Sequence, residues 1–334
     1  MPNAKHVLSF VQRELLGVLR IGFGLIWCIN IWFDLHAQHL DHYLSGYQSA
    51  MQSGPHWLAP WLGSVIGAFQ AIGPHTAAVI SVVVEALIAL SLLTGWWGRA
   101  GGWLGLVYSL FMFSTVTTLG APFSLGYTDP GPWPPYIIAF VFILETQAWR
   151  GLRLGSARDV NQGASPETHG NSAVVARILF GLLWAFEAYW KWHPYFIGHF
   201  LTYLTPAAQG QPAWIAAYID AVIAVVGVVG GAVFGVFTAI VETLIAASLL
   251  SGRALRYGLV LGALWSVGIW TTAEGWGGPY GHGFSASPMP GDIFGNAINY
   301  AYIFLFLLAV YGPWGRAAQH ETSYQAQERP AHPG

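Results

Sequence analysis

The chain has 334 residues, of which only 8% are charged and 15% are aromatic, and its formal net charge is −2. Because a typical soluble domain has about 25% charged residues, this chain has too few charges to cover a surface in water. The near-neutral balance and the lack of any basic run also exclude a nucleic-acid partner, so the expected surroundings are a lipid bilayer.

The sequence contains the same unit twice. Residues 84–95 (VEALIALSLLTG) return as residues 241–252 (VETLIAASLLSG), which is a shift of 157 residues. The shift holds without a gap from Arg20 to Gly126. A repeat of this length indicates two copies of one folding unit. The predicted organisation is a first four-helix repeat (1–153), a cytoplasmic linker (154–173), a second four-helix repeat (174–315) and a disordered tail (316–334).

Apolar runs close to the ~20 residues that span a bilayer recur along both copies. The expected spans are residues 15–33, 76–93, 102–119, 133–149, 174–190, 232–250, 257–273 and 297–311. This pattern predicts an all-α polytopic membrane protein with eight transmembrane helices, arranged as two parallel four-helix repeats.

Each copy also holds a shorter apolar piece, residues 57–72 and 214–229, which leaves a fifth span per copy as the alternative. A helix of this length reaches about 24 Å, short of the ~30 Å hydrocarbon core. With four spans per copy, 12 of the 13 basic residues fall on one side and only Lys191 on the other. The positive-inside rule therefore favours eight spans in a bacterial inner membrane, with both termini cytoplasmic and the short helices on the outer surface.

One carboxylate lies deep in the second span of each copy. Glu85 and Glu242 stand about ten residues from the cytoplasmic turn, roughly 15 Å into the bilayer. A carboxylate at that depth is paired or protonated, so both are expected to face the protein interior. One hypothesis makes them catalytic groups that exchange protons with a quinone or along a proton path. The alternative is a structural hydrogen bond across helices to Thr115, Thr272 or a neighbouring serine.

Polar residues also gather in the outer loops, where they form the predicted cofactor-binding set: His36, His42, His193, His199, Asp129 and Asp292. Such histidines can donate to a quinone carbonyl or shuttle protons, whereas a solvated interfacial loop is the alternative. The six-residue spacing of the shared histidine pair is not a helical metal-ligand spacing, so no metal site is predicted. Glu187 and Lys191, four residues apart on one helix, are expected to pair.

Several segments resemble one known family. They are the glutamate-bearing second span with its LLTG or LLSG turn, the arginine-bearing turn that follows, the openings RIGFGLIW (20–27) and RILFGLLW (177–184), and GDIFGNA (291–297). Over residues 15–153 and 174–316 the chain resembles the DoxX/DoxD-like membrane proteins. The resemblance implies two fused four-helix units, each with a short outer-surface helix.

The family's best-known activity belongs to the DoxD subunit of thiosulfate:quinone oxidoreductase. The resemblance therefore implies a membrane subunit of a quinone-coupled oxidoreductase, with quinone as the cofactor. A partner subunit must then supply the electrons, because the sequence shows no donor site of its own. A non-enzymatic role stays open as the alternative: a membrane anchor, an assembly factor of a larger complex, or a small-solute carrier.

Overall fold

All regular structure is helical in the parts of the chain that the computed structural model describes, which are residues 4–35, 40, 42–120, 129–155, 173–277 and 295–312. The first half contains α1 (Ala4–Asp34), α3 (Tyr43–Ser53), α4 (Ala59–Ile72), α5 (Pro74–Thr94), α6 (Gly98–Thr115) and α7 (Trp133–Thr146). The second half contains α9 (Val174–Lys191), α10 (Pro194–Gly198), α11 (Ala213–Val229), α12 (Gly231–Ser251), α13 (Leu255–Thr272) and α14 (Asn296–Tyr311). The predicted all-α class is confirmed.

Among the described residues, three helical segments are long and apolar enough to cross a membrane: Phe10–Asp34 within α1, α5 and α12. Helices α7, α11 and α14 are also apolar but shorter. Large apolar side chains are exposed at equivalent positions of both copies. On α5 they are Ile80, Val83 and Leu87, and on α12 they are Phe237, Ile240 and Leu244. A repeated apolar outer face of this kind suits contact with lipid.

The second and third long helices of each half have the same boundaries at the 157-residue shift. Helices α5 and α12 each have 21 residues, and α6 and α13 each have 18. Glycines with positive φ separate the same elements: Gly73 and Gly230 (φ 93° and 107°) precede α5 and α12, and Gly95 and Gly252 (φ 75° and 69°) end them. Because L side chains rarely adopt this backbone region, glycine sets these turns in each copy.

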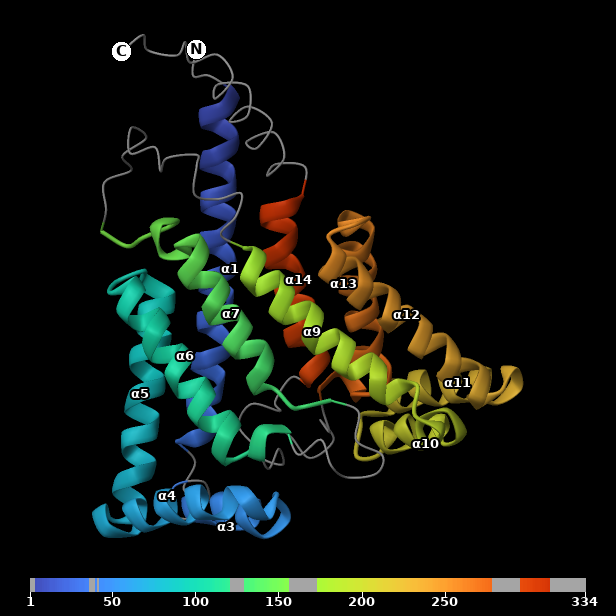
Figure 1. The fold of residues 1–334 in the computed structure, drawn as a ribbon, viewed down its shortest axis with the longest axis horizontal. Coiled ribbons are helices and arrows are strands. Elements are labelled where there is room, and N and C mark those ends of the chain that lie inside the picture. The colour runs from blue at the N-terminus through green and yellow to red at the C-terminus, as the bar shows by residue number, and fades with distance from the viewer. Residues whose placement is uncertain are drawn as a thin grey trace.

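Figure 1 shows the start of α1 and the end of α14 at one end of the molecule, with α3, α4 and α10 at the other end. Helix α4 lies across the end of α5, and α3 packs beside it. Only one side of α4 is buried, through Leu62, Val65 and Ile66. This helix therefore lies against the bundle end and does not continue α5.

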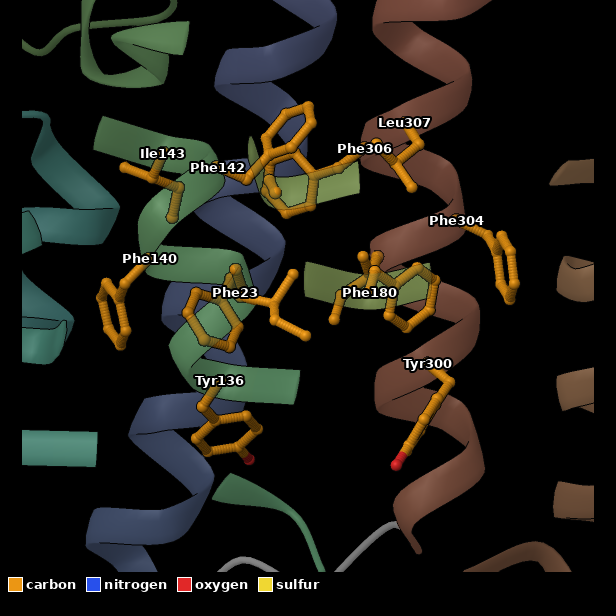
Figure 2. Close-up of a cluster of buried hydrophobic side chains, with 14 of the residues drawn as sticks. Phe23, Tyr136, Phe140, Phe142, Ile143, Phe180, Tyr300, Phe304, Phe306 and Leu307 are labelled. Atoms are coloured by element: carbon orange, nitrogen blue, oxygen red, sulfur yellow. The ribbon is translucent and has the colours of Figure 1, made fainter. Parts of the chain in front are cut away.

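An aromatic core fills the inside of each copy (Figure 2). In the first copy, Trp27 lies 5.7 Å from both Tyr136 and Phe140, measured between ring centroids. The equivalent tryptophan in the second copy, Trp184, lies 5.7 Å from Tyr300 and 5.5 Å from Phe304. These matching contacts put the last helix at a shift of 164 residues. The second copy therefore has seven extra residues before its last helix.

The two halves meet along α7 and α14. Phe142 and Phe306 are equivalent residues at the 164-residue shift, and their rings touch each other with centroids 4.9 Å apart. Helix α7 also packs on α9, while its equivalent α14 packs on α1. In Figure 2, Phe142 and Phe306 point toward each other, whereas Phe140 and Phe304 point away on opposite sides. This pattern is that of a two-fold axis between the copies.

Candidate functional site

Glu85 and Glu242 both face the interior of the protein, as expected. Glu85 is 4% exposed and Glu242 is fully buried. Each lies near the middle of its helix, α5 or α12, between turns that glycines fix at both ends. A carboxyl group withdrawn from water in this way needs hydrogen-bond donors or a counter-charge, and the two copies supply different ones.

In the first copy, Glu85 belongs to a buried cluster of oxygen atoms. The Tyr108 hydroxyl on α6 donates a hydrogen bond to Glu85 Oε1. Ser81, one turn before Glu85, lies 2.7 Å from the same hydroxyl. Asp34, at the end of α1, is 2% exposed and lies against Glu85, close enough for a hydrogen bond between their carboxyl groups. Two acidic side chains thus meet inside one bundle.

Helix α3 extends this cluster toward the end of the bundle. The Tyr43 and Tyr47 hydroxyls lie 3.0 Å apart, and Tyr43 also bonds to Ser81. Burial raises the pKa of both phenols, and the negative charges of Asp34 and Glu85 raise it further. Both phenols therefore stay neutral at physiological pH, able to donate and accept hydrogen bonds.

In the second copy, the buried glutamate Glu242 lies beside a cationic side chain. Lys191 Nζ on α9 lies 3.7 Å from Glu242 Oε2. Trp265 on α13 donates from Nε1 to Glu242 Oε1 at 3.5 Å. The expected partner of Lys191 is Glu187, four residues earlier, and Glu187 does lie within its electrostatic reach. The structure adds Glu242, so the lysine lies in a buried group of charges and not in an outer loop.

The differences between the clusters fall at equivalent positions. At the 157-residue shift Asp34 corresponds to Lys191, and Tyr108 corresponds to Trp265. Three more residues of the first copy that have a hydroxyl or amide group are replaced in the second copy. Tyr43 corresponds to Phe200, Tyr47 to Leu204, and Asn30 to Glu187. One fold therefore carries two different chemistries at the same place.

Of the expected structural partners of the glutamates, the two threonines bond elsewhere, whereas a neighbouring serine, Ser81, does belong to the Glu85 cluster. Thr115 Oγ1 donates to Phe111 O at 2.7 Å, and Thr272 Oγ1 donates to Gly268 O at 2.7 Å, so both hydroxyls bond within their own helices. Tyr108 takes the place predicted for Thr115. The sequence contains a signal for Tyr108, because it is the hydroxyl-bearing residue of α6 that lies about as many residues after the turn between α5 and α6 as Glu85 lies before it.

The predicted outer histidines have local roles where they are described. His36 and Asp292 lie outside the described residues, and His42 is exposed at the start of α3. His193 caps α10, accepting at Nδ1 from Tyr195 N at 3.2 Å. His199 stacks on the Tyr195 ring, with centroids 4.3 Å apart. Within the described ranges no group of three or more metal-ligating side chains comes together.

Asp129 joins the two halves. Its Oδ1 accepts from Asn296 Nδ2 at 3.0 Å and from Gly131 N at 2.6 Å. Glu274 lies beside this junction and accepts from the backbone N–H groups of Asn296 and Ala297, at the start of α14. Asp129, predicted to bind a cofactor, thus has a structural role in the described contacts.

A cavity of about 460 Å³ opens between α6 and α7, away from the carboxyl clusters. Its walls are polar at one end and apolar at the other: Arg99, Glu145 and Gln147, the rings of Trp103 and Trp149, and the aliphatic Leu106, Val141 and Leu144. None of the predicted site residues lines this cavity.

No family model, curated protein or solved structure matches this chain. The DoxX/DoxD-like resemblance of its sequence therefore stays a prediction.

Proposed function

We propose that the chain crosses a bacterial inner membrane eight times, as two parallel four-helix repeats with both termini in the cytoplasm. The helix boundaries that recur in the two halves support this topology. The start of α1 and the end of α14 lie at one end of the molecule, and α4 is buried on one side only, and both features support it too. Helix α4 lies across the end of α5 with one side buried, so we place it, and α11 as its equivalent at the 157-residue shift, at the outer surface. The exposed Asp220 on α11 suits that position.

We propose further that the chain is a membrane subunit of a quinone-coupled oxidoreductase, similar to DoxD. The observation that carries this proposal is the buried Asp34–Glu85–Tyr108 cluster. Three polar side chains in one apolar bundle are costly for stability, and groups of this kind inside a membrane commonly carry protons. Quinone reduction takes up two protons with every two electrons, and a partner subunit that oxidises a reduced sulfur compound such as thiosulfate would supply the electrons.

The α6–α7 cavity suits an amphipathic ring with a long apolar tail. Arg99 and Gln147 are donors for ring oxygens, Trp103 and Trp149 offer faces for stacking, and Leu106 lies at the apolar end. We place the quinone ring here and not at the outer histidines, because His193 and His199 already bond within their own turn.

The test measures thiosulfate-dependent quinone reduction in membranes that contain the full-length chain. Glu85→Gln should lower this rate tenfold or more at unchanged protein level. Asp220→Asn, an exposed acid on α11, is the control and should keep the native rate. Arg99→Gln should lower the amount of quinone that co-purifies with the protein.

Full activity of Glu85→Gln would contradict the proposal. If removal of the whole chain changes only the abundance of a partner complex, the chain is an anchor or assembly factor. The ion pair of Lys191 with Glu242 is the feature that favours such a structural role, because it gives the buried Glu242 a counter-charge.

A further inference from the structure

The wall of the α6–α7 cavity includes a carboxyl group, that of Glu145 near the end of α7. Its Oε2 atom is buried and receives no hydrogen bond from the described residues. The backbone N–H of Ala176, in the first turn of α9, faces the same carboxyl group, and Tyr311 on α14 lies within its electrostatic reach. One oxygen atom of Glu145 therefore still lacks the donor that a buried polar atom requires.

A group of opposite charge lines the same cavity. Arg99 is exposed at the start of α6 and forms no ion pair with Glu145 in the described contacts. A guanidinium group only donates hydrogen bonds, whereas a carboxyl group accepts when it is ionised and donates when it is protonated. Glu145 repels a phosphate group and Arg99 repels an ammonium group. The two side chains together suit a neutral ligand whose polar end both accepts and donates hydrogen bonds.

Glycines on α6 make room for this cavity wall in the first copy. A Cβ atom at Gly98 would overlap the Trp149 ring, which is part of the wall, and Gly102 follows one turn later. At the 157-residue shift, the positions of these two glycines hold Leu255 and Leu259. Leu259 is fully buried, so the second copy packs larger side chains into this helix face.

The second copy also lacks the carboxyl and amide groups of the cavity. At the 164-residue shift of the last helix, Glu145 corresponds to Ala309 and Gln147 to Tyr311. The arginine is kept, because Arg256 is the equivalent of Arg99. The full set of donors and acceptors therefore belongs to the first copy, and the second copy supplies matched control positions.

We infer that Glu145 contacts the ligand of the α6–α7 cavity and selects a ring that carries a hydroxyl group, as a hydroquinone does. Arg99 and Gln147 donate to one ring oxygen, and Glu145 accepts a hydrogen bond from the hydroxyl group at the other. The faces of Trp103 and Trp149 take the ring. This inference rests on the proposed function and adds the residue that distinguishes the reduced ligand from the oxidised one.

Equilibrium binding to the purified full-length protein in phosphatidylcholine nanodiscs tests the inference without an electron donor. The probes, kept free of oxygen, are a decyl-tailed hydroquinone and its dimethyl ether, which retains ring and tail but has no hydroxyl group. The native protein should bind the hydroquinone at least tenfold more tightly, because the ether leaves the buried carboxyl oxygen without a donor. Glu145→Ala, which copies the second repeat, should bind the two probes with equal affinity.

Three further variants separate a ligand contact from a structural role. Glu145→Gln should restore most of the preference, since an amide oxygen also accepts a hydrogen bond. Arg99→Gln should weaken the binding of both probes, whereas its matched control Arg256→Gln should leave both unchanged. Thermal unfolding is measured for every variant. If Glu145 only holds the start of α9, Glu145→Ala will lower the melting temperature and keep the native preference between the probes, which would overturn the inference.

Two other results would also overturn it. One is equal affinity of the native protein for the two probes. The other is displacement of the hydroquinone by phosphatidylglycerol at a ratio at which phosphatidylcholine has no effect, because the cavity would then hold a lipid phosphate group. The proposed function can survive such a result: loss of quinone reduction in Glu85→Gln, together with unchanged probe preference in Glu145→Ala, would keep the quinone-coupled role and reject the role of Glu145.

Discussion

A single fully buried arginine holds three segments of the first copy together. Arg20 on α1 donates from Nη1 to the carbonyl of Leu92 at the end of α5, and from Nη2 to Gly151 O and Leu152 O at 3.1 and 3.2 Å. The last carbonyls of a helix have no partner within it, and the negative end of the helix dipole attracts a cation. Arg20 thereby satisfies the end of α5 just before the turn at Gly95.

Arg20→Lys should destabilise the protein by about 1–3 kcal/mol, because one ammonium group cannot reach carbonyls on both sides as the planar guanidinium does. Thermal unfolding in detergent, followed by tryptophan fluorescence, measures the change. Arg13→Lys is the matched control, since Arg13 is partly exposed and pairs with its neighbour Glu14 at 3.2 Å. Equal melting temperatures for the two variants would show that the fork geometry of Arg20 is unimportant.

At the scale of elements, glycines let neighbouring helices approach closely. A Cβ atom at Gly105 on α6 would overlap the Phe140 ring on α7, and one at Gly262 on α13 would overlap Phe304 on α14. Small residues at such crossings give membrane helices their close packing. The same glycine–phenylalanine contact in both copies therefore fixes the position of α7 against α6 and of α14 against α13.

Gly262→Ala should cost about 1–3 kcal/mol of stability, the usual effect of overfilling a packed core. Gly268→Ala on the same helix is the control, because a Cβ there meets no atom within 4 Å. The first variant should melt at a lower temperature than the native protein, and the control close to it. Helix propensity favours alanine over glycine, so a loss of stability as large in Gly268→Ala would mean that the contact with Phe304 does not set the effect.

At the scale of the whole molecule, the two copies pack around a two-fold axis through the α7–α14 contact. Equivalent helices then make equivalent contacts, and α4 and its equivalent α11 lie at the ends of the bundle where α5 and α12 begin. The turns at Gly95 and Gly252, where α5 and α12 end, lie at the opposite ends of these two helices. The proposed topology therefore puts α4 and α11 on one side of the membrane.

Cysteine labelling in intact cells tests this topology once the single Cys28 is replaced. Trp57, Ile72 and Trp96 are exposed, so each can carry the reporter cysteine. Positions 57 and 72 should react with an impermeant reagent from outside, whereas position 96 should react only after the cells are opened. Reaction of 57 and 72 from opposite sides would mean that α4 crosses the bilayer.

The sequence by itself determined the helices, their duplication and the burial of the two glutamates. These features depend on local patterns: apolar runs of fixed length, glycines at turns that need positive φ, and the high cost of a carboxylate in lipid. Each can be read along the chain, because neighbours in sequence decide them. The seven-residue difference before the last helix could not be read in this way, since it is set by the contacts of Phe140 and Phe304 with glycines on another helix.

Only the tertiary structure decided what each glutamate touches. Asp34, Tyr43 and Tyr108 lie on three different helices, tens of residues from Glu85, and helix packing alone brings them together. The same packing turns Lys191, which the sequence places in an outer region beside Glu187, inward to Glu242. The chemistry of a buried carboxyl group depends on charges a few ångströms away, and those distances are fixed by the fold and not by the order of residues.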